Sequence, residues 1–220
     1  MVKTWSADNP KAALMTQKRD AIVGAALSAF LDTGYAEASV NRIAAAAGVS
    51  IKTLYRHFES KDELFSAVMQ AACAASGSGP GDPAWYAEPP AIALPLAGAE
   101  YLRHALSPAQ LALYRVVTRD ADRFRELGRR YHAETVAQRV ALVAGYLDRW
   151  SARAGWPECD PAEVGRVFEA LLQAGIFEAA LHGLNMPDEG EIQRRSAIAA
   201  ARLLILLKEN GFRAPNLRSV

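Results

Sequence analysis

Apolar residues recur at intervals of three and four along almost the whole chain, and few stretches alternate between apolar and polar residues. This spacing places apolar side chains on one face of a helix, and the abundant alanine and leucine favour helices. Of the 220 residues, 51% are hydrophobic and 22% are charged, a balance that permits a sizeable buried core. The sequence therefore predicts an all-α protein with one large domain or two smaller ones.

The overall charge, the cysteine spacing and the length of the apolar runs argue against a polycationic protein, a disulfide or zinc scaffold, and a membrane protein. The formal net charge is +1, so nucleic-acid binding would have to come from a local basic patch. Cys73 and Cys159 lack the spacing of a zinc site or a disulfide framework, which favours a reducing, cytoplasmic setting without a metal or other cofactor. The longest apolar run, Ala197–Leu207, is shorter than the roughly 20 residues that span a bilayer. Because a signal peptide is also missing, we expect a soluble protein without a membrane partner.

Breaks in the helical pattern predict the domain organisation. Residues 1–15 have no periodic pattern and are predicted to form a flexible arm. The glycine- and proline-rich segment 77–83 is predicted to be a linker or loop, because it lacks the Gly-Lys-Ser/Thr of a phosphate-binding loop. We expect a small N-terminal domain over residues 16–62 and a second helical domain over residues 63–220.

The predicted N-terminal domain begins with a helix near Thr16. Gly34 supplies the left-handed position that ends a helix, and Tyr35 can fold back onto the helix. The apolar face of this helix is formed by Ile22, Ala26, Ala29 and Phe30.

Two short helices joined by a tight turn follow. Ser39 is a good N-cap for the first, Gly48 breaks it, and Ser50 caps the second, which is predicted over 51–57. The sequence Ser-Lys-Asp-Glu at 60–63 matches a capping box, and a fourth helix is expected to run from there to about Ala75.

The helix over 51–57 carries the pattern expected of a DNA-reading helix. Leu54 and Phe58 point inward, which leaves polar and basic side chains on the outer face. Residues 38–61 contain four basic and one acidic side chain, a local charge of +3. Such a helix can enter a major groove about 12 Å wide. The alternative is a plain three-helix core with a solvated polar face.

At fixed spacing, residues 16–70 resemble the DNA-binding domain of the TetR/AcrR family of bacterial repressors. The resemblance rests on Ala47-Gly48-Val49-Ser50, Thr53-Leu54-Tyr55, His57-Phe58, Ser60-Lys61 and Leu64-Phe65, and on Phe30 and Gly34-Tyr35 in the preceding helix. It implies an Ω-shaped homodimer that binds a palindromic double-stranded operator through its N-terminal domains. The C-terminal domains would dimerise and enclose a small-molecule effector.

Carried onto this sequence, the resemblance implies a set of DNA contacts. Ser50 would approach phosphate through backbone N–H groups, and Lys61 would bind a phosphate. Ile51 departs from the polar residue common in the family and could contact a thymine methyl group. The remaining contacts fall on Ser39, Val40, Asn41, Lys52, Thr53, Tyr55, Arg56 and His57.

The C-terminal part is predicted to contain five or more helices. They are expected over about 91–106, from Pro108, over 122–154 with a break near Gly128, from Asp160 to about Gly183 or Asn185, and over 189–210. An apolar or amphipathic effector is expected against some of the residues Tyr101, His104, Tyr114, Phe124, Tyr131, Phe168 and Leu172. Core packing is the simpler explanation for most of these aromatic residues.

The last two predicted helices are expected to form the dimer interface. The run Ala197–Leu207 is apolar nearly all round, and Gly175 would allow close approach. The interface residues are predicted to be Phe168, Leu171, Gly175, Ile198, Ala201 and Ile205.

Two other functions fit the sequence less well. An enzyme would need a catalytic constellation, and the faint zinc-deaminase pattern at His132 and Cys159 lacks a second cysteine. A DNA organiser without an effector would need much less chain than residues 63–220. We therefore expect a ligand-responsive regulator, a repressor rather than an enzyme.

Overall fold

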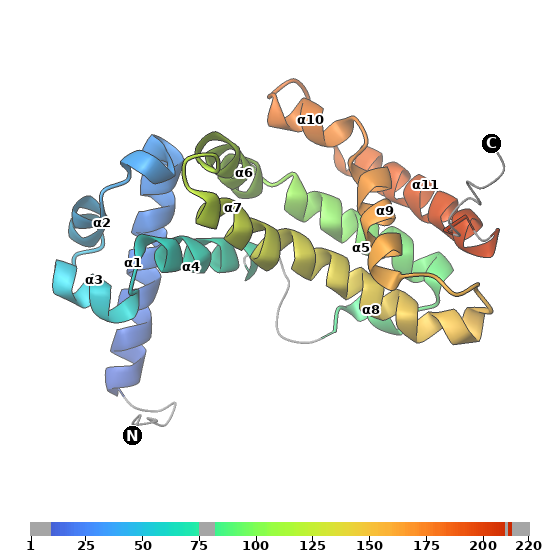
Figure 1. Cartoon of the computed structure of the whole chain (residues 1–220), viewed down its shortest axis with the longest axis horizontal. Coiled ribbons are helices and arrows are strands. Elements are labelled where there is room, and N and C mark those ends of the chain that lie inside the picture. Colours follow the sequence, from blue (N-terminus) through green and yellow to red (C-terminus); the bar gives the residue numbers. More distant parts are fainter. Residues whose placement is uncertain (1–9, 75–81, 210, 213–220) are drawn as a thin grey trace. The chain divides into compact units, whose positions relative to one another are not determined.

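A computed structural model describes residues 10–74, 82–209 and 211–212. All regular elements within these ranges are helices, which confirms the predicted all-α class (Figure 1). The elements are α1 (Pro10–Glu37), α2 (Val40–Ala46), α3 (Ile51–His57), α4 (Lys61–Ala74), η1 (Ala84–Ala87), α5 (Pro90–Ala105), α6 (Pro108–Asp120), α7 (Arg125–Tyr131), η2 (His132–Val136), α8 (Ala137–Ala154), α9 (Pro161–Gln173), α10 (Ile176–Leu181) and α11 (Glu189–Lys208).

The chain divides into two compact units. The first consists of Met1–Ala75 and Ala112–Thr135, and the second consists of Ser76–Leu111 and Val136–Val220. The first unit therefore contains α1 to α4, most of α6, and α7. The second contains α5 and α8 to α11.

The first unit is built on α1. Pro10 begins this helix six residues before the predicted start near Thr16, so the prediction of a flexible arm was wrong for residues 10–15. Proline suits the first helical position because it has no N–H to leave unsatisfied, and the alanines and Leu14 that follow favour helix. Residues 1–9 lie outside the described ranges. Helix α1 contacts α2, α3 and α4, and the buried residues of this unit include Ile43, Leu54, Phe58, Leu64 and Phe65.

The end of α1 matches the sequence-based prediction. Gly34 has a φ of +84°, and Tyr35 turns back so that its ring stacks on Phe30 with the centroids 5.6 Å apart. Phe65 of α4 meets both rings edge-on at 5.3 and 5.5 Å. This aromatic cluster anchors the N-terminal end of α4 to the C-terminal end of α1.

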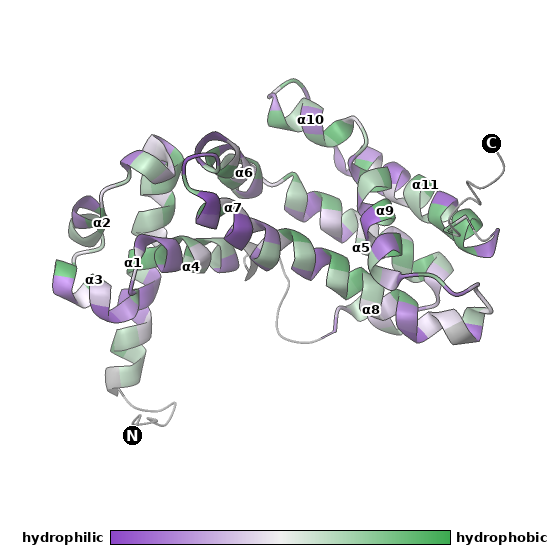
Figure 2. Cartoon of the chain, viewed as in Figure 1, coloured by the Kyte–Doolittle hydropathy of each residue, from purple (hydrophilic) through white to green (hydrophobic). Residues whose placement is uncertain are grey.

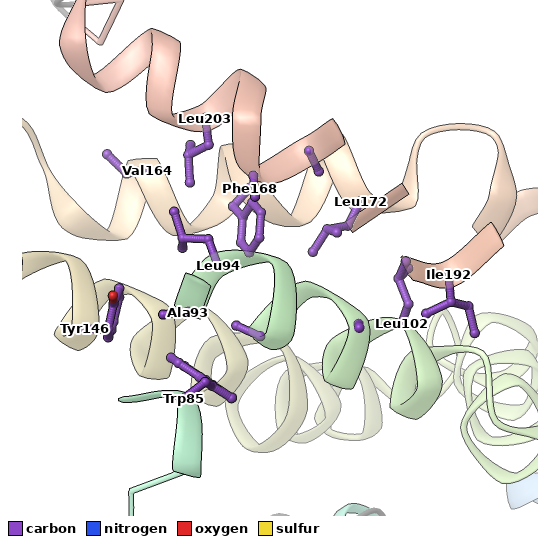
Figure 3. Packing of buried hydrophobic residues seen from close by; sticks show 14 of the residues in the cluster. Trp85, Ala93, Leu94, Leu102, Tyr146, Val164, Phe168, Leu172, Ile192 and Leu203 are labelled. Carbon is purple, nitrogen blue, oxygen red and sulfur yellow. The ribbon is translucent and has the colours of Figure 1, made fainter. Parts of the chain in front are cut away.

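The second unit consists of packed helices around a core of aliphatic and aromatic side chains. Figure 3 shows Leu94 of α5, Phe168 and Leu172 of α9, and Leu203 of α11 converging in this core. Gly98 lets α5 approach closely, because a Cβ there would lie 2.9 Å from Leu172 Cδ2. Both apolar and polar residues line α8 along its length, as a helix with one buried face requires (Figure 2).

Three helix boundaries in the C-terminal half differ from the predictions. The expected break near Gly128 lies instead at 132–136, where a π-helical segment joins α7 to α8. The helix from Pro161 ends at Gln173 rather than near Gly183, because Gly175 adopts a φ of +76° and starts α10. The last helix ends at Lys208, and Asn210 lies outside the described residues.

Candidate nucleic-acid interface

The turn between α2 and α3 is fixed by backbone hydrogen bonds and one side-chain cap. Gly48 has a φ of +66° in this turn, and Val49 N donates to Ala44 O at 3.0 Å. Ser50 Oγ accepts from Thr53 N at 3.1 Å, which confirms Ser50 as the N-cap of α3. Ser39 occupies the N-cap position of α2, but its side chain makes no capping hydrogen bond there.

The outer face of α3 presents the side chains that the sequence predicted. Leu54 is buried, and Lys52, Tyr55 and Arg56 are exposed, with 51% of Tyr55 accessible. Ile51 is also exposed, so it can reach a partner outside the chain. Ser50 is exposed and Thr53 is half-buried, and their hydroxyl oxygens lie 2.9 Å apart.

Helix α2 contributes a second, smaller set of exposed polar side chains. Asn41 and Arg42 are exposed, whereas Ser39 and Val40 are half-buried at the helix start. The structure therefore brings the predicted residues of α2 and α3 onto the same small three-helix unit.

His57 differs from its neighbours on α3. It is half-buried, and its buried Nε2 has no hydrogen-bond partner within the described ranges. Burial, together with the positive charges of Arg56 and Arg19, lowers the pKa of His57 below its ordinary value. The imidazole is therefore expected to be neutral near pH 7 and to add no charge to the interface.

Two basic residues near α3 were missed by sequence reasoning. Lys18 and Arg19 lie in the third turn of α1, and the Arg19 guanidinium carbon is 5.2 Å from the centroid of the Phe58 ring. Both residues act electrostatically on His57. The adjacent basic pair on the polar side of the first helix was the signal that could have found them.

The cations around α3 have no acidic partners within the described ranges. None of the ion pairs found there involves Lys18, Arg42, Lys52 or Arg56. Unpaired cations beside the exposed face of α3 attract a polyanion such as DNA, since neutralising its phosphates releases condensed counterions.

Lys61 has contacts inside the unit. Its Nζ donates to Ala36 O at 3.2 Å and lies 4.7 Å from the centroid of the Tyr35 ring. Burial lowers the pKa of this ammonium. The predicted capping box at the start of α4 is present in altered form, since Ser60 Oγ accepts from Glu63 N while the Glu63 carboxylate accepts from Glu59 N. A phosphate contact by Lys61 stays a prediction.

The predicted effector residues fall into two groups. Tyr101, Phe168 and Leu172 line one small cavity in the second unit, and Tyr101 and His104 line a neighbouring one. The other three lie in the first unit, where Phe124 meets Tyr35 at 5.2 Å and the Tyr114 and Tyr131 rings are 6.0 Å apart.

The predicted dimer residues also differ in exposure. Phe168 is buried in the core of its own subunit, Leu171 is half-buried, and Gly175 is exposed. On α11 the side chains of Ile198, Ala201 and Ile205 lie exposed along one face, with 53% of Ile205 accessible.

Metal and membrane sites were searched over the described residues only. These residues contain no group of histidine, cysteine and acidic side chains that could hold a metal ion. Among the same residues, no helix is both long and apolar enough to cross a membrane.

Comparisons with known proteins place both halves of the chain in one family. Residues 22–68 match the model for bacterial regulatory proteins of the tetR family. Residues 93–207, more than half of the chain, match the model for the C-terminal domain of AefR-like transcriptional repressors.

Individual relatives agree with these matches. The HTH-type transcriptional activator FasR of Mycolicibacterium smegmatis is 46% identical over 54 residues, so the match spans only 25% of FasR. The flavonoid-responsive regulator FrrA is 26% identical, with a TM-score of 0.76 over 90% of this chain and 100% of FrrA. NalD, the secondary repressor of the MexAB-OprM efflux pump in Pseudomonas aeruginosa, shares the fold at 22% identity and a TM-score of 0.62, over 85% of this chain and 96% of NalD. The chain belongs to the TetR family of bacterial transcriptional regulators.

Proposed function

We propose that this protein is a cytoplasmic, dimeric repressor that binds a palindromic operator and is released by a small apolar or amphipathic effector. The observation that carries the proposal is the exposed face of α3, where Lys52, Tyr55 and Arg56 stand beside cations without acidic partners in the described part of the chain. In a homodimer two such helices would enter successive major grooves about 34–36 Å apart.

The residues of the interface have different roles in this proposal. Lys52 and Arg56 are one helical turn apart on the exposed face, so either can reach a guanine edge. Tyr55 and the backbone at Ser50 contact phosphates, and Lys18, Arg19 and Arg42 add sequence-independent attraction. Lys61 Nζ donates to Ala36 O, which leaves two of its three N–H donors for a phosphate.

The exposed apolar face of α11 supports the dimer. Isolated apolar side chains on a surface are common, but Ile198, Ala201 and Ile205 follow one another at intervals of three and four on a single helix. A two-fold axis would place this face against its own copy.

The second unit is the proposed effector-binding region. FrrA is described as flavonoid-responsive, and its likeness over nearly the whole chain favours an aromatic effector here as well. Coupling to DNA would pass through α4, since Ser66 Oγ accepts from Arg130 Nη1 at 2.9 Å and Gln70 Nε2 donates to Glu134 Oε2 at 3.3 Å. The chain that carries Arg130 and Glu134 continues directly into α8 of the second unit.

Selection of bound DNA from a random pool tests the proposal. Wild-type protein should select a palindromic motif, and replacing the base reader by alanine should cost about 1–3 kcal/mol and relax one position in both half-sites. The variants are Lys52→Ala and Arg56→Ala, with the exposed Arg153→Ala of α8 as the matched control. An unchanged motif for both Lys52→Ala and Arg56→Ala would mean that other residues read the bases.

A salt titration separates phosphate contacts from base contacts. Loss of one phosphate contact per subunit should reduce the slope of log affinity against log salt by about 0.9 per contact. The sequence-based prediction assigns such a contact to Lys61, so Lys61→Ala should weaken binding to all DNA sequences alike. If the salt slope stays unchanged while thermal stability falls, the role of Lys61 is confined to its contacts with Ala36 and Tyr35.

A further inference from the structure

The second unit contains a polar cluster that is not explained by packing. Arg139 of α8 has a side chain that is only 20% exposed, and its Nη2 lies 3.6 Å from Glu169 Oε1 of α9. The Tyr101 ring of α5 lies beneath the guanidinium, with 5.2 Å between the ring centroid and Cζ. Tyr101 donates its hydroxyl proton to Glu169 Oε1 at 2.8 Å and accepts from Gln173 Nε2.

Two groups of this cluster are buried and have no hydrogen-bond partner among the residues that the structure describes. These are Arg139 Nε, and Nδ1 of His104, a residue that is only 9% exposed. A buried polar atom without a partner is costly, so each one calls for an explanation such as a bound ligand, ion or water. Burial, and then the charge of Arg139, lower the pKa of His104 to about 4, which leaves the imidazole neutral at pH 7.

Both unsatisfied residues line the same cavity. Its volume is about 60 Å³, and its other walls are mainly Trp85, Tyr101, Leu142 and Val143. A second cavity of about 20 Å³ shares Tyr101, Arg139 and Val143 with it and extends toward Phe168 and Leu172. The stacked Tyr101 and Arg139 side chains therefore separate two apolar spaces that would merge if the pair moved.

The charges around the cavity select for an uncharged ligand. Glu169 offsets the charge of Arg139, and Glu100 adds a further carboxylate that accepts from Trp85 Nε1 at 3.0 Å. An anion would thus meet one cation and two carboxylates. A neutral oxygen acceptor can satisfy Arg139 Nε, which always carries its proton, without this repulsion.

We propose that this site binds an uncharged aromatic molecule bearing a carbonyl or hydroxyl oxygen, which is held by Arg139 Nε and His104 Nδ1 between the rings of Trp85 and Tyr101. The inference rests on the proposed effector-binding role of the second unit and names the chemical class of the effector. Because known ligand pockets usually exceed about 300 Å³, we expect binding to widen the space around Tyr101 and Arg139 so that the two cavities join.

Calorimetric titration of the full-length protein without DNA tests the site. The probes are the neutral flavanone naringenin and a matched pair, anisaldehyde and anisate, which differ in charge. We expect naringenin and anisaldehyde to bind and anisate to bind at least roughly tenfold more weakly. Preference for anisate, or no binding by either neutral probe, overturns the assignment.

Variants locate the binding groups. Arg139→Met and His104→Phe retain most of the side-chain volume and should each weaken naringenin binding by roughly tenfold, as expected for a lost buried hydrogen bond. Arg149→Met, an exposed substitution on the same helix, is the control and should leave affinity unchanged. The inference is overturned if the folded Arg139→Met and His104→Phe variants bind naringenin as tightly as the wild type does. If a variant does not fold, the comparison of anisaldehyde with anisate still tests the site on the wild-type protein.

The two proposals fail in different ways. Operator release by naringenin is measured separately, on the DNA motif that the wild-type protein selects. Binding that follows the predicted charge and residue dependence without operator release supports this site and contradicts the proposed regulation. Operator release by a compound whose affinity is insensitive to Arg139 and His104 contradicts this site alone.

Discussion

Replacing Gly34 by alanine should destabilise the protein, although the same change elsewhere in α1 should stabilise it. Gly34 has φ and ψ of +84° and 174°, a region that is essentially restricted to glycine and costs other residues about 1–3 kcal/mol. An added Cβ would also fall 0.9 Å from Arg119 Nη2, which donates to Thr33 O at 3.2 Å. Since the Arg119 side chain is 54% exposed, it can swing away, and the contact adds at most about 1 kcal/mol.

Gly24 provides the matched control on the same helix. It lies within the regular part of α1, and a Cβ there would meet no atom within 4 Å. Gly24→Ala should therefore stabilise by about 0.8–1.0 kcal/mol, the difference in helix propensity between the two residues. Gly34→Ala should destabilise by about 2–3 kcal/mol, so the two substitutions differ in sign.

Urea and thermal unfolding, followed by circular dichroism, measure both effects. Each kcal/mol shifts the Tm by about 2–4 °C in a chain of this size. Backbone strain does not depend on the Arg119 side chain. If it dominates, Gly34→Ala should lower the free energy of unfolding by the same amount, within about 0.5 kcal/mol, in the wild type and in an Arg119→Ala background. A neutral or stabilising Gly34→Ala would refute the reasoning, and disappearance of its cost in the Arg119→Ala background would assign the effect to the steric clash.

Three further predictions concern the second unit. Gly98→Ala should lower the free energy of unfolding in urea by about 1–3 kcal/mol, because the added Cβ would lie 2.9–3.3 Å from atoms of Leu172, Ser196 and Phe168, which belong to two different helices. Unchanged stability would contradict this packing. The free energy of unfolding should fall by about 2–3 kcal/mol as the pH drops from 6.5 to about 4, because the unfolded chain protonates His104 while the folded protein holds it neutral. His104→Phe should flatten this pH dependence, and an equal decline in the variant would exclude His104 as its source. If the protein forms the proposed dimer, light scattering of the wild type should give about twice 23.7 kDa, and Ile205→Glu should give a monomer. A dimer that persists in Ile205→Glu would place the interface elsewhere.

Local signals in the sequence were sufficient for much of the N-terminal domain. The N-cap at Ser50, the positive φ at Gly34 and the fold-back of Tyr35 depend on residues within a few positions of each other. The division of α3 into a buried Leu54 and exposed Lys52 and Arg56 follows from helical periodicity alone. The predicted helix starts at Pro108 and Asp160 are likewise local, since Ser107 Oγ accepts from Gln110 N and Asp160 Oδ1 accepts from Ala162 N.

Long-range packing decided the features that the sequence left open. The N–H of Ala36 donates to Asp120 Oδ2 across 84 residues of sequence, and Phe124 joins the Tyr35 cluster instead of the cavity around Tyr101. Lys61 was expected to reach outward, yet its Nζ is held by Ala36 O.

The cluster of Arg139, Tyr101 and Glu169 likewise comes from three different helices. Most of the helices, and the apolar face of each, could be predicted from the sequence, because turns, caps and periodicity act between near neighbours in the chain. Which polar groups meet could not be predicted, because two distant residues come together only when their helices pack, and the packing of helices is set by the shape of their whole apolar faces.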